Sequence, residues 1–377
     1  MRDLGFTEPT PVQLGAIPPA LAGRDVLGSA ATGSGKSAAF GLPLLQRLID
    51  LPRGKTRVLI LAPTRELAAQ IAEHLQSLAR HTNVKVAAVY GGVGFGAQVG
   101  AFRRGTDIIV ATPGRLLDHL TQGTASLAGI ETLVIDEADR MLDMGFLPDV
   151  RRILRKVPAE RQTLFFSATI PTPIATLSKE ILRDPVRIDL ATKGAPAAGI
   201  TQTIYSIDQL RKADLLIELL KKDSNIYSAI AFTRTKARAN RLAAKLEKHN
   251  ITTERIHGDR SQAQRTRALA DFKNGKYRIL VATDIAARGI DIAALGHVVN
   301  YDVPMVAEDY VHRVGRTARA KATGDAITFV APDEEKYFAQ IERALGRRLD
   351  RAKNPPLPPP SANAAPPPPP RRRPRHA

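Results

Sequence analysis

The chain of 377 residues contains no cysteine. This absence excludes disulfide bonds, thiolate metal sites and cysteine nucleophiles, and it fits a reducing cytosol. The eight histidines are scattered without a zinc-binding pair of the HExxH kind, so we assign no structural metal. No apolar run approaches the roughly 20 residues that span a bilayer, and no signal peptide is visible at Met1. We therefore expect a cytoplasmic protein without a membrane partner.

Acidic residues are scarce relative to basic ones. Fifty-five Lys and Arg stand against 37 Asp and Glu, which gives a net charge of +18 and a pI near 10.3. This excess favours a polyanionic partner, because basic side chains that neutralise phosphates release condensed counterions. Residues 353–377 hold five Lys or Arg and no acid, so +13 belongs to the rest of the chain. Charge alone leaves two interpretations open, a nucleic-acid-binding protein and a generic basic protein.

Short apolar runs alternate with amphipathic segments of helical length. This alternation predicts an α/β fold, in which helices cover parallel sheets. In the first half we expect strands at 58–62, 84–90, 107–111, 132–135 and 163–167, with helices that include 65–80 and 115–120. In the second half we expect strands at 228–232, 253–257, 278–282, 297–300 and 325–330, with helices at 236–249, 262–274, 308–317 and 334–345.

The boundaries between these parts follow from composition. Residues 191–199 are small, contain Gly and Pro and lack periodicity, which predicts a linker. Proline and alanine dominate 354–370, which predicts an extended, disordered segment. The basic tip at 371–375 is either a solvated tail or an accessory arm that tethers RNA. We therefore expect domain 1 over 1–190, a linker over 191–200, domain 2 over 201–350 and a tail over 351–377.

A phosphate-binding loop is predicted at residues 30–37 (AATGSGKS), between a short strand and an apolar helix start. Gly33 and Gly35 let backbone N–H groups point into one concavity at a helix N-terminus, where anions are favoured. Lys36 would reach the terminal phosphates, and Ser37 would place a hydroxyl on Mg²⁺. The strict motif has glycine at its first position, where this chain has Ala30. The alternative is therefore a glycine-rich turn that binds nothing.

Adjacent carboxylates follow the apolar run at 133–135. Asp136 is expected at the carboxyl edge of the sheet, where open α/β sheets bind ligands, and it can hold Mg²⁺. Glu137 can orient and deprotonate the water that attacks the γ-phosphate. The alternative is an acidic helix N-cap. The two motifs, in this order within one sheet, predict NTP binding.

The second motif ends at Asp139 and reads DEAD, and the chain resembles the DEAD-box RNA helicase family over residues 4–345. The similarity is greatest to the bacterial RhlE-type branch. The matching motifs follow the family's order at 5–13 (GFTEPTPVQ, the Q motif), 30–37, 63–68 (PTRELA), 91–92 (GG), 112–115 (TPGR), 136–139, 167–169 (SAT), 231–234 (AFTR), 257–259 (HGD), 282–291 (ATDIAARGID) and 312–319 (HRVGRTAR).

The resemblance implies two RecA-like domains, each a parallel sheet flanked by helices, that close over ATP, Mg²⁺ and single-stranded RNA. It implies a catalytic set of Glu137, Asp136, Lys36 and two arginine fingers, Arg316 and Arg319. The implied nucleotide contacts are Gln13 on adenine, Asp291 on ribose, and Thr32, Gly33, Ser34, Gly35, Lys36 and Ser37 on the phosphates, with Ser37 and Asp136 on Mg²⁺. Coupling of the ATP site to the RNA is implied for Asp139, Ser167, Thr169 and His312. The implied RNA contacts are Thr64, Arg65, Gly92, Thr112, Arg115, Arg234, Gly258, Arg265 and Thr283.

We therefore expect an ATP-dependent RNA helicase that is stimulated by RNA and locally unwinds short duplexes or remodels RNA–protein complexes. Backbone contacts carry no base information, so binding should be independent of sequence, and 2′-hydroxyl contacts would favour RNA over DNA. The alternative is an ATP-gated RNA clamp or annealing chaperone with little unwinding. A DNA-directed motor is disfavoured by the Q and DEAD motifs. Ribosome-assembly or RNA-decay proteins are the expected protein partners.

Two departures from the family pattern stand out. Family members usually carry an aromatic residue well upstream of the Q-motif glutamine, and only twelve residues precede Gln13. We therefore expect weakened ATP affinity for the chain as written. Ala318 stands where the family more often has glycine, and we expect no loss of fold, because alanine is the better helix former by about 1 kcal/mol.

Overall fold

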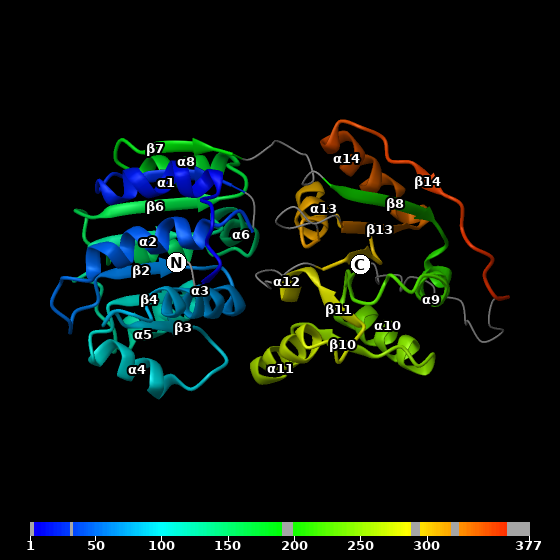
Figure 1. The fold of residues 1–377 in the computed structure, drawn as a ribbon, viewed down its shortest axis with the longest axis horizontal. Helices are drawn as coiled ribbons and strands as arrows, with labels where there is room; N and C mark the ends of the chain where they lie inside the picture. Colours follow the sequence, from blue (N-terminus) through cyan, green and yellow to red (C-terminus); the bar gives the residue numbers. More distant parts are fainter. Residues whose placement is uncertain (1–3, 31–32, 191–198, 288–294, 318–323, 360–377) are drawn as a thin grey trace, which may run out of the picture. The chain divides into compact units, whose positions relative to one another are not determined.

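The computed structural model describes residues 4–30, 33–190, 199–287, 295–317 and 324–359. The chain divides into two compact units. Each unit is built on a parallel seven-stranded sheet flanked by helices (Figure 1). This confirms the predicted α/β class with two tandem sheets. No helix within the described ranges is long and apolar enough to cross a membrane.

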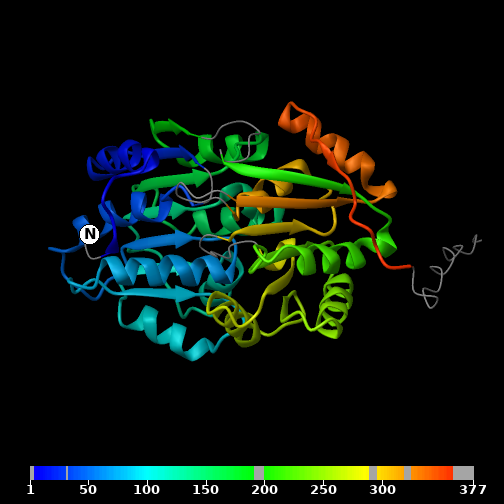
Figure 2. The same cartoon turned by 45° about the vertical axis from the view of Figure 1, so that its right-hand side comes forward.

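The first sheet has the strand order β3-β4-β2-β5-β6-β1-β7, and every neighbouring pair is parallel. The carboxyl ends of its strands therefore lie at one edge, as the arrowheads in Figures 1 and 2 show. The strands are β1 (Val26–Ser29), β2 (Val58–Leu61), β3 (Val86–Val89), β4 (Ile108–Ala111), β5 (Thr132–Ile135), β6 (Gln162–Ser167) and β7 (Val186–Asp189). The helices are α1 (Pro11–Leu21), α2 (Lys36–Leu48), α3 (Arg65–Leu78), α4 (Phe95–Arg103), α5 (Pro113–Thr121), α6 (Ala138–Asp143), α7 (Leu147–Leu154) and α8 (Thr172–Ile181).

Both faces of the first sheet are buried. Successive strand residues point to opposite faces, so Val26 of β1 lies in one core and Leu27 in the other. The first core contains residues of α1, α2 and α3, such as Phe40, and the second contains residues of α5 to α8, such as Met141. Burial on both faces explains why the strands are continuous apolar runs in the sequence.

The second sheet has the order β10-β11-β9-β12-β13-β8-β14 and is also parallel throughout. Its strands are β8 (Ile200–Ser206), β9 (Ala229–Thr233), β10 (Thr253–Ile256), β11 (Ile279–Thr283), β12 (His297–Asn300), β13 (Gly324–Val330) and β14 (Arg351–Ala352). Its helices are α9 (Lys212–Lys222), α10 (Lys236–Lys248), α11 (Gln262–Lys273), α12 (Asp284–Ala287), α13 (Ala307–Val314) and α14 (Glu335–Leu345). Short 3₁₀ turns occupy Gln209–Arg211 and Pro332–Glu334.

The start of the predicted tail is wrong. Arg351–Ala352 form β14 and pair with β8 at the edge of the second sheet. The side-chain amide of Asn354 donates to the Ser206 carbonyl oxygen at 2.8 Å, and Leu357 packs against the core. A proline-rich segment cannot build a core of its own, but it can lie on an edge strand that supplies the partner. Ile200, expected as the last linker residue, is the first residue of β8. Residues 360–377 lie outside the described ranges.

Candidate nucleotide and RNA site

The predicted phosphate-binding loop joins β1 to α2 at the carboxyl edge of the first sheet. Gly33 and Gly35 have φ values of 83° and 97°, a region that favours glycine. A Cβ at Gly35 would lie 2.7 Å from the Gln13 amide nitrogen, so this position excludes a side chain. The ammonium of Lys36 is buried and donates to the Ala30 carbonyl oxygen at 2.8 Å. The described part of the loop is therefore a tight glycine-containing turn, and its lysine folds back onto a carbonyl oxygen of the same loop.

The adjacent carboxylates lie at the same edge, directly after β5. Asp136 is 2% exposed. Burial raises the pKa of the Asp136 carboxyl to about 6, and the nearby Glu137 and Asp139 add to this rise, although the ammonium of Lys36 lowers it. A buried carboxylate with a raised pKa is stabilised by a further cation, which fits a divalent metal held together with the Ser37 hydroxyl.

Glu137 is held in an uncommon backbone conformation. Its φ of 52° and ψ of 53° are left-handed values that residues other than glycine rarely adopt. Its carboxylate accepts from the guanidinium of Arg140 one helical turn later, and the two side chains are 5% and 3% exposed. Sequence reasoning did not assign a role to Arg140. The spacing of three residues inside the helix was the available signal.

Gln13 joins the Q motif to the phosphate-binding loop. Its side-chain oxygen accepts from the Thr10 N–H at 2.9 Å, and its amide nitrogen donates to the Gly35 carbonyl oxygen at 3.3 Å. Thr10 caps α1, which contains Gln13. Gln13 therefore lies beside the phosphate-binding loop. Its predicted contact with adenine stays a prediction.

Three of the four residues predicted to couple ATP to RNA meet in the first unit. The Asp139 carboxylate accepts from the Thr169 N–H at 2.8 Å and from the Thr169 hydroxyl at 3.0 Å. The Ser167 hydroxyl accepts from the Asp139 N–H at 3.0 Å. The end of β6 is therefore tied to the helix that follows Glu137. The fourth residue, His312, lies on α13 of the second unit.

Two arginines of the first unit that were predicted to contact RNA lie against residues 91–95, which end at the first residue of α4. The guanidinium of Arg65 lies against Gly91 and Gly92, where a side chain at either position would crowd it. Arg115 lies 5.4 Å from the centre of the Phe95 ring and donates to the Val93 carbonyl oxygen at 3.4 Å. The two threonines predicted to contact RNA each precede a helix: Thr64 caps α3, and Thr112 precedes α5. Phe95 was missed by sequence reasoning.

In the second unit, Arg234 and Thr283 end or follow neighbouring strands, β9 and β11, at the carboxyl edge. The guanidinium of Arg234 donates to Glu334 at 2.9 Å and to the Val303 carbonyl oxygen at 3.2 Å. The other two predicted contacts, Gly258 and Arg265, lie in residues 258–267, which group with the first compact unit. Gly258 follows β10 and has open space where a Cβ would lie, and Arg265 on α11 donates to the Ala286 carbonyl oxygen at 3.2 Å.

The arginines of the 312–319 motif differ in role. Arg313 makes a two-pronged ion pair with Asp284 at 2.6 and 2.7 Å and donates to the Asp302 carbonyl oxygen at 2.7 Å, so it is committed to the fold. The N–H of Arg316 donates to the Arg313 carbonyl oxygen at 3.0 Å, just after α13. Thr32, Asp291, Ala318 and Arg319 lie outside the described residues.

A buried ionic cluster supports this edge of the second sheet. Lys212 is fully buried, pairs with Glu334 and lies 3.7 Å from Asp302. Burial lowers the pKa of Lys212, although Glu334 and Asp302 oppose the change. The same two carboxylates bind Arg234 and Arg238. The cluster therefore fixes the backbone from which Arg234 projects.

Comparison with known proteins bears on these two sheets together. Residues 10–177 match the DEAD/DEAH box helicase family, and residues 211–321 match the helicase conserved C-terminal domain. The DEAD-box ATP-dependent RNA helicase CshA of Bacillus subtilis is 44% identical over 354 residues, which are 94% of this chain and 71% of that protein. The chain belongs to the DEAD-box ATP-dependent RNA helicase family. The ATP-dependent RNA helicase CshA of Listeria monocytogenes is 46% identical over 93% of this chain and 67% of its own length.

Solved structures of DEAD-box proteins share the fold. Dbp5 of S. cerevisiae bound to RNA and ADP BeF3 matches with a TM-score of 0.83 and 30% identity over 92% of this chain and 90% of its own. Mss116p bound to ssRNA and AMP-PNP matches with a TM-score of 0.84 and 30% identity over 93% of this chain and 75% of its own. The two sheets of this helicase are thus the expected RecA-like pair.

Proposed function

We propose that this DEAD-box helicase hydrolyses ATP when RNA is bound and locally separates short RNA duplexes or remodels RNA–protein complexes. The observation that carries the proposal is the linked set of buried side chains at one sheet edge. Lys36 and Asp136 line the phosphate loop, Glu137 is oriented by Arg140, and Asp139 connects them to Thr169. The residues proposed to act on ATP are therefore connected through Asp139 to Thr169, at the same edge of the sheet.

In this proposal Lys36 leaves the Ala30 carbonyl oxygen to contact the terminal phosphates. Asp136 and the Ser37 hydroxyl would hold Mg²⁺, and Ser34, whose hydroxyl has no partner among the described residues, would bind a phosphate oxygen. Mg²⁺ would supply charge neutralisation on the phosphates. Glu137 accepts the proton of the attacking water, while its ion pair with Arg140 fixes the position of the carboxylate. Thr32 and the two loop glycines complete the cradle.

The second domain would supply Arg316 and Arg319 to the γ-phosphate. Phosphoryl transfer depends mostly on positioning and electrostatics, and an arginine delivered on closure is worth on the order of 10³–10⁵ in rate. Hydrolysis would then require both domains. ATP and RNA would each favour the closed state, so each should tighten binding of the other.

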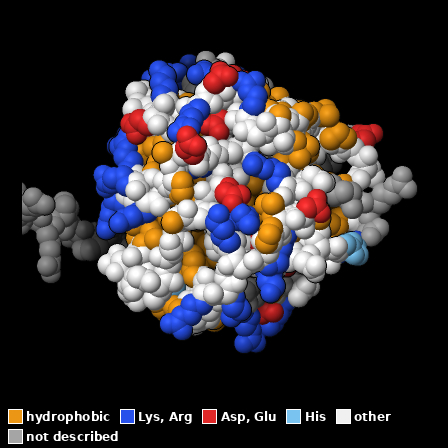
Figure 3. Space-filling view, turned by 90° about the vertical axis from the view of Figure 1, so that its left-hand side faces the viewer, with side chains coloured by type: hydrophobic (Ala, Val, Ile, Leu, Met, Phe, Trp, Pro, Cys, Tyr) orange, Lys and Arg blue, Asp and Glu red, His pale blue; other side chains and the backbone are white. Residues whose placement is uncertain are grey.

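RNA would lie against residues 91–95 and their neighbours in the first domain and against Arg234, Gly258, Arg265 and Thr283 of the second predicted domain, residues 201–350. Lys and Arg side chains are spread over the face shown in Figure 3, in keeping with the net charge of +18. Contacts of this type reach phosphate and sugar, so we propose binding without sequence preference.

Finer assignments are proposals of the same kind. We place the protein in the cytoplasm, with ribosome-assembly or RNA-decay proteins as partners. Ala318 and the motif series favour the RhlE-type branch, whereas the relatives compared above are named CshA. A phylogeny that contains both groups and this chain decides between them.

Strand displacement tests the proposed function. A short RNA duplex with one labelled strand is incubated with the protein, with ATP or with a non-hydrolysable analogue. The proposal predicts release of the labelled strand with ATP. RNA-stimulated ATP hydrolysis without strand release would favour the clamp or annealing chaperone instead.

A further inference from the structure

A cavity of about 430 Å³ lies at the amino-terminal edge of the second sheet. Tyr227 stands at its rim, two residues before β9, and is 69% exposed. The cavity is lined by Leu220, Lys221, Ser224, Tyr227, Thr252, Gly275 and Arg278. An aromatic ring left in water beside a cavity is a contact surface without a partner in its own fold.

The loop that carries Tyr227 is fixed without a ligand. The guanidinium of Arg278 donates to the carbonyl oxygens of Leu220 and Ile226 at 2.7 Å and of Asp223 at 3.3 Å. The Asp223 carboxylate accepts from the Asn225 N–H at 2.8 Å, and the Ile226 side chain is buried in the core. A ring on a pinned loop loses little conformational entropy on binding.

The hydroxyl end of Tyr227 lies near Gly296, just before β12. A Cβ built at Gly296 would lie 3.8 Å from the Tyr227 hydroxyl oxygen and 4.0 Å from a ring carbon. The hydroxyl end of Tyr227 therefore approaches the backbone at Gly296, and most of the side chain remains open to solvent. This arrangement suits stacking by a flat partner.

The surrounding charge favours a polyanion. Lys222, Lys248 and Lys273 lie at the ends of α9, α10 and α11, and all three are exposed. Within the described ranges, none of them has a carboxylate within 4 Å. Lys221 pairs with Glu218 yet remains half exposed. Helix C-termini favour cations in any protein, so these lysines do not by themselves indicate a ligand. The exposed ring of Tyr227 is the observation that points to a ligand with a flat aromatic group.

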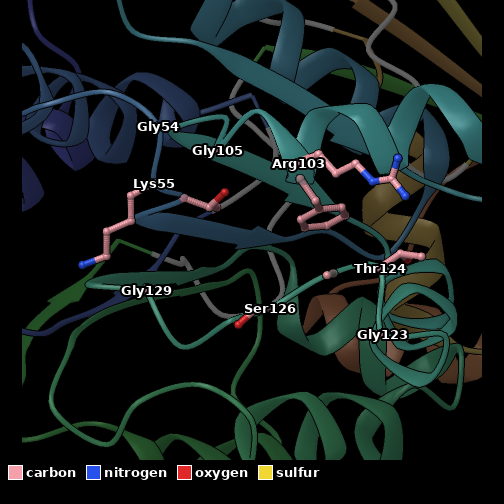
Figure 4. A pocket seen from close by; sticks show the side chains of 11 residues that line it. Gly54, Lys55, Arg103, Gly105, Gly123, Thr124, Ser126 and Gly129 are labelled. Carbon is pink, nitrogen blue, oxygen red and sulfur yellow. The ribbon is translucent and has the colours of Figure 1, made fainter.

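The first unit also has a cavity at the amino-terminal edge of its sheet, but this cavity, as far as the structure describes its lining, lacks an exposed aromatic ring. It measures about 370 Å³ and is rimmed by Lys55, Arg103 and several glycines (Figure 4). No large aromatic side chain among its described lining residues is exposed, since Phe102 packs against the core. That cavity has cations at its rim but, in the described part of the chain, no exposed aromatic ring, whereas Tyr227 adds a stacking surface to the cavity of the second unit.

We propose that Tyr227 stacks on an unpaired base of RNA and that the neighbouring lysines contact the flanking phosphates. Single-stranded nucleic acid is bound by this combination of aromatic rings and basic side chains. The proposal rests on the helicase function and adds a second contact to it. The five residues of β9 separate Tyr227 from Arg234 by roughly 15 Å or more. Only RNA that extends past the predicted path reaches Tyr227.

Equilibrium binding to RNA of two lengths, about 8 and about 40 nucleotides, tests the proposal. The variants are Tyr227→Ala, Tyr227→Phe and, as a control for lost apolar surface, Leu210→Ala, since Leu210 is 65% exposed on the same unit. Stacking of one base predicts that Tyr227→Ala weakens binding of the long RNA about fivefold or more. Binding of the short RNA should stay unchanged, and the Phe and Leu210 variants should behave like the wild type.

Equal affinity of Tyr227→Ala and wild type for the long RNA would overturn the proposal. So would an equal loss for both RNAs, because that indicates a general defect. Ultraviolet crosslinking to the long RNA adds an independent readout, and a crosslinked peptide must contain Tyr227. ATP hydrolysis stimulated by the short RNA should be the same in Tyr227→Ala and in the wild type. If the wild type itself shows no such hydrolysis, the proposed helicase function fails, which is a different result from failure of the Tyr227 proposal.

Discussion

The buried ion pair between Arg140 and Glu137 makes the sharpest prediction for stability. Glutamine at position 140 keeps most of the side-chain volume but removes the positive charge. The carboxylate of Glu137 then remains buried without its cation, since both side chains are at most 5% exposed. We expect Arg140→Gln to destabilise the first unit, and to do so more strongly at neutral than at acidic pH.

The size of the effect follows from two limits. Loss of one partner of a buried ion pair costs about 3–5 kcal/mol. Glu137 can avoid the charge by binding a proton, which for a carboxyl of pKa near 4.3 costs about 4 kcal/mol at pH 7 and about 2 kcal/mol at pH 5.5. Other contacts of Glu137 make these values upper bounds. At about 2–4 °C per kcal/mol, Tm should fall by at most about 8–15 °C at pH 7 and by about half of that at pH 5.5.

Thermal unfolding of the full chain measures this difference. The matched control is Arg152→Gln, because Arg152 also pairs with an acid three residues away, Asp149, but at 3.4 Å with exposed fractions of 56% and 30%. That exposed pair should contribute less than about 0.5 kcal/mol. The reasoning fails if Arg140→Gln lowers Tm at pH 7 no more than Arg152→Gln does, or if its effect is the same at both pH values.

Three further predictions concern the site and its support. Asp139→Ala removes the acceptor of both Thr169 bonds. We expect the free energy of unfolding to fall by about 2 kcal/mol and fewer RNA strands to be displaced per ATP hydrolysed. An unchanged number of strands displaced per ATP would contradict the coupling role of Asp139. Because burial raises the pKa of Asp136 to about 6, the carboxylate that would hold Mg²⁺ is lost below that pH, so Mg²⁺–ATP affinity in a fluorescent-nucleotide titration should fall from pH 7.5 to 5; a flat profile would count against this role. The contribution of Asp136 to stability without ligand has the opposite sign, since it is present below the ordinary pKa near 3.8 and is lost as pH rises through about 6. Lys212→Met leaves two buried carboxylates with one cation fewer and should cost about 3–5 kcal/mol in denaturant unfolding, whereas the exposed Lys221→Met control should change stability little.

Much of the fold follows from periodicity. The strand expected at 132–135 coincides with β5, and the helix expected at 236–249 ends one residue late relative to α10. Strands β7, β8 and β14 were missed, because each is only partly buried and therefore lacks the continuous apolar run of a central strand. Helix α1 was missed as well, since Pro18 and Pro19 inside it argue against a helix.

The candidate site divides in a similar way. Short-range motifs located the phosphate loop, the acidic pair and the residues that contact Asp139. The contacts that hold these groups depend on chain segments distant in sequence, as in the bond from Gln13 to Gly35 and the bonds from Thr169 to Asp139. Arg313 lies in the same motif as the predicted fingers, and only its ion pair with Asp284 reveals a structural role.

We propose above that Glu137 activates the attacking water and that RNA stimulates ATP hydrolysis. Steady-state ATP hydrolysis by the wild type and by Glu137→Gln, with and without single-stranded RNA, tests it most directly. We expect strong RNA stimulation in the wild type and loss of turnover in the variant, which still binds ATP and RNA. Hydrolysis by Glu137→Gln at the rate of the wild type, with the same response to RNA, would contradict it.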